Sequence, residues 1–153
     1  MELNKYIIII ILLNLTNFLY ADIIQPAKNL TAYEVVKIQL TALKNNNKQS
    51  KNDGIKQTWI FAHPENKKYT GPYERFEKMI EGNQYKILLN HTSHKISLIS
   101  NTEDNYTYKI ELITKNKKIY FYEWQLEKST TVNCESCWFT TMVSPPVNIG
   151  DVI

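Results

Sequence analysis

The chain has 153 residues, of which 43% are hydrophobic and 22% charged, and this length and composition are typical of a single globular domain. Lys and Arg together number 18 against 15 Asp and Glu, so the formal net charge is only +3. Nucleic-acid binders usually carry a clear cluster of Lys and Arg, and the small charge excess therefore disfavours that class. With only four Gly, the chain has no Gly-rich loop of the kind that binds phosphate.

Residues 1–21 have the layout of a secretory signal peptide. Lys5 precedes an apolar run over residues 6–13, and a more polar stretch then ends at Ala21, a small residue suited to cleavage. We expect cleavage after Ala21, so that the mature chain begins at Asp22 and the protein is exported, either periplasmic or secreted. The alternative is an uncleaved membrane anchor, but a span needs about 20 apolar residues and would here include Asp22. After cleavage we expect no integral membrane segment.

A helix is predicted after a short N-terminal extension over residues 22–30. Thr31 and Glu34 have the spacing of a capping box, in which two side chains pair with the free amides of a helix start. Apolar side chains then recur at helical intervals as far as Leu43. Residues 45–52 are polar and read as a linker.

Two further helices are predicted before the chain changes its periodicity. Asp53 can begin a short second helix that carries Trp59, and we expect Pro64 to end it. A third helix should begin near Pro72, because the missing amide of proline does no harm in a first turn. Phe76 would lie on the apolar stripe of this helix.

The second half of the mature chain predicts strands. Apolar and polar residues alternate over residues 106–112 and again over 120–127, with a polar turn at 115–118 between them. This pattern predicts an antiparallel hairpin with one buried face. Residues 95–100 and 138–144 are further candidate strands.

Helices followed by a meander of strands indicate an α+β fold. We expect three N-terminal helices packed on a curved antiparallel sheet of about four strands. One domain would cover residues 31–146, and residues 147–153 would form a C-terminal tail.

Several segments carry a resemblance to a known family. They are Asp53-Gly54-Ile55, Trp59-Ile60-Phe61-Ala62-His63-Pro64-Glu65-Asn66, Thr70-Gly71-Pro72-Tyr73-Glu74-Arg75-Phe76, Leu88-Leu89-Asn90-His91, Tyr122-Glu123-Trp124-Gln125-Leu126 and Cys137-Trp138-Phe139-Thr140. Together they resemble the uncharacterised family called domain of unknown function 4864, in the nuclear transport factor 2-like (cystatin-like α+β) superfamily. The resemblance implies a cone of helices against a bent antiparallel sheet, often enclosing a pocket. It implies no activity, and His63 and Cys134 depart from the family pattern.

Cys134 and Cys137 form a C-x-x-C pair and are the only cysteines. A catalytic redox pair usually begins a helix after a strand, whereas this pair precedes a predicted strand. Export would place it in an oxidising compartment, where a structural disulfide is the ordinary outcome. We predict a disulfide without a catalytic role, and free thiols stay open as the alternative.

His91 and His94 add two more potential zinc ligands. Two Cys and two His can hold zinc, but the spacing of the histidines is short, and residues three apart on an extended segment point to opposite faces. We therefore expect no metal and no cofactor. A structural hydrogen bond explains His91 equally well, and a surface or capping role explains His94.

Aromatic side chains dominate one face of the predicted sheet. The candidate pocket-lining residues are Trp59, Phe76, His91, Tyr108, Tyr122 and Trp124. Such residues either orient a ligand in a pocket or form an ordinary core against the helices. Two interpretations are also open for Glu74 and Arg75, which could form a buried ion pair or lie on a solvated face of the helix.

Three functions remain open. The first is an exported, non-enzymatic domain that binds an apolar small molecule or a protein partner. The second is an acid–base enzyme that uses His91, Asp53 or a tyrosine on a small hydrophobic substrate. The third is a redox- or metal-responsive protein that acts through Cys134 and Cys137. The sequence leaves the ligand and the oligomeric state unknown.

Overall fold

The computed structural model describes residues 23–152, so the predicted signal peptide lies outside the described residues. The helices are α2 (Ala32–Lys44), α3 (Asp53–Ile60), α4 (Pro64–Thr70), α5 (Tyr73–Glu81) and the 3₁₀ turn η1 (Lys86–Leu88). The strands are β1 (Ser93–Asn101), β2 (Asn105–Ile113), β3 (Lys118–Thr131), β4 (Cys134–Val143) and β5 (Val147–Asp151). Helices thus precede strands, and the predicted α+β class is confirmed.

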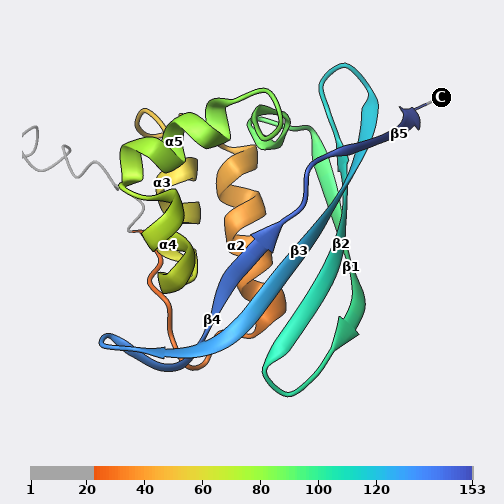
Figure 1. Cartoon of the computed structure of the whole chain (residues 1–153). Coiled ribbons are helices and arrows are strands. Elements are labelled where there is room, and N and C mark those ends of the chain that lie inside the picture. The colour runs from red at the N-terminus through yellow and green to blue at the C-terminus, as the bar shows by residue number, and fades with distance from the viewer. Residues whose placement is uncertain (1–22, 153) are drawn as a thin grey trace, which may run out of the picture.

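The strands form one five-stranded antiparallel sheet in the order β1-β2-β3-β4, and β5 pairs with the first part of β3. Figure 1 shows the helices gathered on one side of this sheet, with α2 nearest to the strands. The layout agrees with the cone that the family resemblance implies.

Two elements differ from the sequence-based prediction. We expected Pro64 to end the second helix, but α3 already ends at Ile60 and Pro64 begins α4. The reason is local: Pro64 occupies the first helical position, where no amide is needed, and Nδ1 of His63 caps the helix by accepting from the amide of Glu65 at 3.2 Å. The second difference is β5, which lies in the segment expected to be a tail.

The central helix α2 begins as predicted. The hydroxyl of Thr31 accepts from the amide of Glu34 at 3.2 Å, and the Glu34 carboxylate accepts from the amide of Thr31 at 2.7 Å. This reciprocal capping box satisfies two amides that the helix itself cannot bond. The buried face of the helix carries Val36, Leu40 and Leu43, which are fully enclosed.

The predicted β2–β3 hairpin supplies the opposite wall of the core. Tyr108 pairs with Trp124 and Ile110 with Tyr122, and all of these side chains are buried. Because alternate residues of a strand share a face, the intervening polar residues point away from the helices. The sequence alternation and the observed burial therefore agree.

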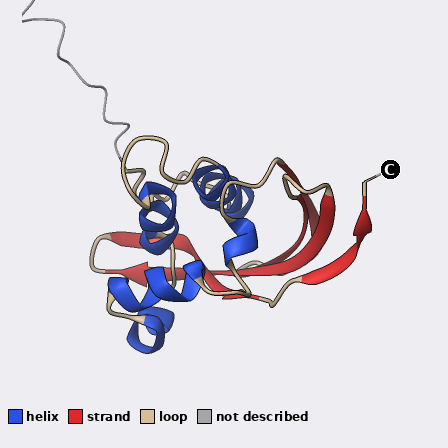
Figure 2. Cartoon of the chain, turned by 90° about the horizontal axis from the view of Figure 1, so that it is seen from above, coloured by secondary structure: helices blue, strands red, loops and turns tan. Residues whose placement is uncertain are grey.

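The sheet bends around the helices, as the view from above in Figure 2 shows. Register shifts occur between Leu98 and Ser100, between Gln125 and Leu126, and again near both ends of β3. Such bulges increase the local twist of a strand and bend it. Curvature produced in this way leaves room for side chains and cavities between the sheet and the helices.

The side chain of Gln57 on α3 binds the N-terminal extension. Gln57 accepts from the amide of Ile24 and donates to its carbonyl oxygen, both at 2.8 Å. This side chain thus pairs with the backbone of the extension as a neighbouring strand would. The extension consequently has a fixed position directly after the predicted cleavage point.

Candidate functional site

A cavity of about 290 Å³ lies between the helices and the last part of β4. Helices α2, α3, α4 and α5 all contribute to its wall, together with Trp124 from β3 and residues 140–143 of β4. Ligand pockets commonly measure about 300–1,000 Å³. The cavity is therefore just below the usual range for small-molecule sites, and its volume suits a small ligand.

A buried polar network forms the floor of this cavity. The side-chain oxygen of Gln39 accepts from the Trp124 indole at 3.1 Å and from the Thr140 hydroxyl at 2.6 Å. Its amide nitrogen donates to the carbonyl oxygen of Thr58 at 3.1 Å. Gln39 is only 1% exposed, and an unpaired polar group at such a depth would be costly. Here the polar groups satisfy one another.

Polar groups on the side wall are paired in the same way. The side-chain amide of Asn66 donates to the carbonyl oxygens of Thr140 and Thr141 and so ties α4 to β4. The Tyr85 hydroxyl donates to the carbonyl oxygen of Val143 at 3.1 Å, and burial raises the pKa of this phenol. The wall is left with mainly apolar surface for contact with a ligand.

The mouth of the cavity is apolar and open to solvent. Tyr69 from α4 is 74% exposed, Met79 from α5 37% and Met142 from β4 38%, and all three line the cavity. Methionine side chains are flexible and adapt to different apolar shapes. This part of the wall can thus adjust to an entering molecule.

The candidate pocket-lining residues divide into distinct groups. Phe76 and Trp124 line the cavity. Trp59 packs behind Phe76, with ring centroids 5.0 Å apart. Tyr122 belongs to the core, with its hydroxyl donating to the carbonyl oxygen of Gln84 at 3.4 Å. Tyr108 lines a different cavity.

His91 lies outside the cavity and bonds to His94. Its Nδ1 lies 2.7 Å from the carbonyl oxygen of Leu88, and since a carbonyl only accepts, Nδ1 carries the proton. Nε2 then accepts from Nδ1 of His94 at 2.7 Å. Burial lowers the pKa of His91 to about 4, against the opposing hydrogen bond to Leu88 and with help from the charges of His94 and Lys44. Both hydrogen bonds support the structural interpretation.

Asp53 also has a structural position. Its carboxylate accepts from the backbone amides of Asn47 and Gly54 at 2.8 Å and of Gln49 at 2.9 Å, which fixes the linker before α3. Burial alone would raise the pKa of Asp53, but these amides outweigh it and the pKa is lowered. Asp53 lines a separate cavity of about 570 Å³ beside α2 and α3, and it does not line the cavity described above.

Cys134 and Cys137 are paired in a disulfide, as predicted. The pair lies at the start of β4, next to the turn that joins it to β3, and neither cysteine lines the cavity. Among residues 23–152, no group of three or more His, Cys, Asp or Glu is placed to hold a metal ion. Glu74 and Arg75 are exposed on α5, which fits the solvated face rather than the buried pair.

Sequence reasoning missed the polar floor of the cavity. Gln39 occupies a core position of α2, between Val36 and Leu43 on the buried face. The sequence signal for this network was the side-chain amide of Gln39, which stands alone among apolar residues at helical spacing. Its partners Thr58 and Thr140 come from distant segments, and no local pattern identifies them.

The fold and cavity define an α+β domain in which helices cover the concave face of an antiparallel sheet. A family model described as "Domain of unknown function (DUF4864)" matches residues 25–142, and the chain belongs to this family. Searches of curated proteins and of solved structures find no significant match. No helix within residues 23–152 is long and apolar enough to cross a membrane.

Proposed function

We propose that this protein is an exported, non-enzymatic domain that binds an apolar small molecule in the cavity between the helices and β4. The observation that carries the proposal is the composition of the wall. Its lining residues include no Asp, Glu, His, Lys, Arg or Cys, and the buried polar groups of the floor already pair with one another. Such a wall favours apolar contact and offers little to a charged ligand.

The main alternative is an acid–base enzyme acting in the same cavity. General acids and bases must reach the proton that they transfer and need a pKa near the working pH. The two candidates from the sequence, His91 and Asp53, make structural hydrogen bonds elsewhere. Tyr85 is a half-buried phenol of the wall, and its raised pKa and its hydrogen bond to Val143 disfavour a role as base.

A protein partner is the second alternative for the same surface. The exposed Tyr69, Met79 and Met142 at the mouth are suited to receive an apolar side chain from another protein. The depth of the cavity favours a small molecule, because the wall continues inward from this rim to the indole of Trp124. The redox- or metal-responsive alternative would act through the Cys134–Cys137 disulfide, which does not line this cavity.

A fluorescence titration with the apolar dye N-phenyl-1-naphthylamine tests the proposal. The dye should brighten on binding, and Met79→Lys should weaken binding at least about tenfold because it places a charge at the apolar mouth. Leu98→Lys is the matched control, since Leu98 is 54% exposed on β1 and does not line the cavity. Equal affinity of both variants, or no binding by the wild-type protein, would contradict the proposal.

A further inference from the structure

A second cavity, of about 510 Å³, lies at the opposite end of α2. It is lined by residues 28–33, which lead into α2, by the start of β2 and by the hairpin of β3 and β4. It shares no lining residue with the cavity of the proposed function. Any ligand bound here would be recognised by a separate set of side chains.

Aromatic rings form one wall of this second cavity. Tyr106 stacks on Tyr108 with ring centroids 5.9 Å apart and meets Trp138 edge to face at 5.0 Å. Tyr33, from the first turn of α2, approaches Tyr108 edge to face at 6.3 Å. Aromatic walls of this kind favour flat or cyclic molecules, whose faces pack against the rings.

The hydroxyl of Tyr108 has no protein partner in the described chain. The residue is only 4% exposed, a depth at which phenol hydroxyls are normally hydrogen-bonded. Among residues 23–152, Nε2 of His63 is the only side-chain polar atom that has no partner and is also fully closed off from solvent, so the Tyr108 hydroxyl is not in this category. The unpaired Tyr108 hydroxyl must therefore be reached by solvent, and the cavity that Tyr108 lines gives that access.

The lining of this cavity combines hydrogen-bond donors with positive charge. Burial, together with the neighbouring Tyr106 and Tyr33, raises the pKa of Tyr108 to about 12, so the phenol keeps its proton at neutral pH. Lys28 and Lys128 contribute two positive charges, and no Asp or Glu lines the cavity. Donors and cations together match an anionic oxygen acceptor.

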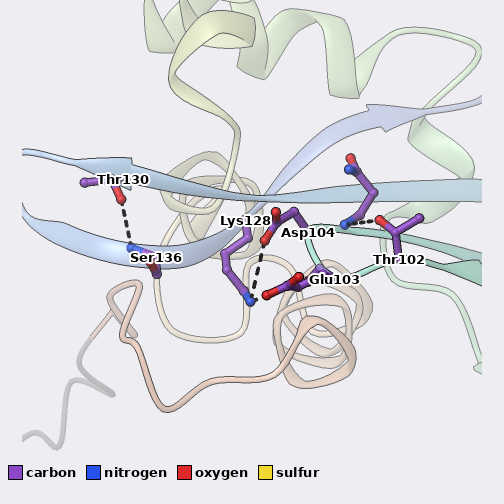
Figure 3. A network of polar contacts seen from close by, with 7 residues as sticks. Thr102, Glu103, Asp104, Lys128, Thr130 and Ser136 are labelled. Carbon is purple, nitrogen blue, oxygen red and sulfur yellow. Dashed lines mark hydrogen bonds and ion pairs between the residues drawn. The ribbon is translucent and has the colours of Figure 1, made fainter.

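Lys128 lines this cavity, and Figure 3 shows its side chain beside Glu103 and Asp104. Its ammonium lies 3.7 Å from Asp104, 3.4 Å from the carbonyl oxygen of Glu103 and 5.0 Å from the centre of the Trp138 ring. Asp104 is 63% exposed, and exposed ion pairs of this kind are weak. Lys128 can thus interact with a ligand without losing a strong partner.

We propose that this second cavity binds a small cyclic molecule that carries a carboxylate. The rings of Tyr106 and Trp138 pack against the body of the molecule, the Tyr108 hydroxyl donates a hydrogen bond to it, and the positive charge of Lys128 attracts its carboxylate. Two classes of molecule combine a ring with a carboxylate in this way, aromatic acids and sugar acids. This site does not depend on the proposed function, because the two cavities are lined by different residues.

Isothermal titration calorimetry on protein produced from the full-length chain tests the site. The probes are benzoate, representing aromatic acids, and glucuronate, representing sugar acids, with benzamide and glucose as uncharged controls. At least one acid should bind with a Kd of about 1 mM or tighter, and its uncharged counterpart at least about tenfold more weakly. The acid that binds identifies the source.

Tyr108→Phe removes one hydroxyl and keeps the ring, and it should weaken binding of the acid about tenfold or more. Tyr122→Phe is the matched control, because its hydroxyl bonds to Gln84 outside this cavity, and it should bind like the wild type. Lys128→Gln should also weaken binding and provides a second test if Tyr108→Phe does not fold. Absence of binding by both acids, equal binding of the uncharged compounds, or unchanged affinity of Tyr108→Phe and Lys128→Gln would overturn the proposal.

Discussion

Replacing Gln39 by Met tests the polar floor of the cavity, because Met has a similar length and cannot replace these hydrogen bonds. The carbonyl oxygen of Thr58 would lose the donor that Gln39 supplies. The backbone amide of Ala62, four residues further along, does not replace it, because this amide already donates to the carbonyl oxygen of Trp59. The hydroxyl of Thr140 would lose its acceptor, whereas the Trp124 indole would keep Thr140. At about 1–3 kcal/mol for each buried group left unpaired, we expect a loss of about 2–6 kcal/mol.

Urea denaturation followed by circular dichroism measures this loss. The midpoint should fall while the dependence on urea concentration stays unchanged, which would indicate lower stability of the same fold. The matched control is Gln25→Met, since Gln25 is exposed and its removal should change stability by no more than about 0.5 kcal/mol. A Gln39→Met midpoint equal to that of the control would refute the assignment of the floor.

Four further outcomes are expected. Phe76→Ala should cost about 3–5 kcal/mol in chemical denaturation, because Phe76 is only 7% exposed, and an unchanged midpoint would contradict this. Replacing Cys134 and Cys137 by Ser should preserve the circular dichroism spectrum and lower stability by about 2 kcal/mol, since the disulfide closes a very short loop; two thiols labelled without reduction would exclude the bridge. Folding lowers the pKa of His91 from 6.5 to about 4, so on acidification the unfolded chain takes up the proton before the folded one. Stability should therefore fall as the pH drops from about 6.5 to 4. The same fall in His91→Gln would exclude this residue as the cause. Edman sequencing of exported protein should begin at Asp22, whereas an intact N-terminus would favour the anchor.

Local patterns predicted most of the fold. The capping box of Thr31 and Glu34 located the start of α2, and alternation located the hairpin of β2 and β3. Both signals arise from neighbours in the sequence, and such neighbours determine where a helix begins and which face of a strand is buried. The C-x-x-C pair was predictable for the same reason, because its two sulfurs are close along the chain.

The features of the fold that the sequence did not predict depend on contacts between distant segments or, at Pro64, on the capping of a helix. We expected Pro64 to end a helix, but the cap that His63 supplies makes Pro64 the start of one. The pairing of β5 with β3 joins segments that have no common sequence signal. Gln39 similarly meets Thr140, 101 positions away, so the floor of the cavity emerged only from the tertiary structure.

Native mass spectrometry of the protein purified from its own host tests the central claim most directly. The account predicts a species heavier than the polypeptide by the mass of an apolar small molecule, and this extra mass should disappear under denaturing conditions. In Met79→Lys purified in the same way, the heavier species should be strongly reduced. A spectrum that contains only the mass of the bare polypeptide, or only that of a complex with another protein, would contradict small-molecule binding in this cavity.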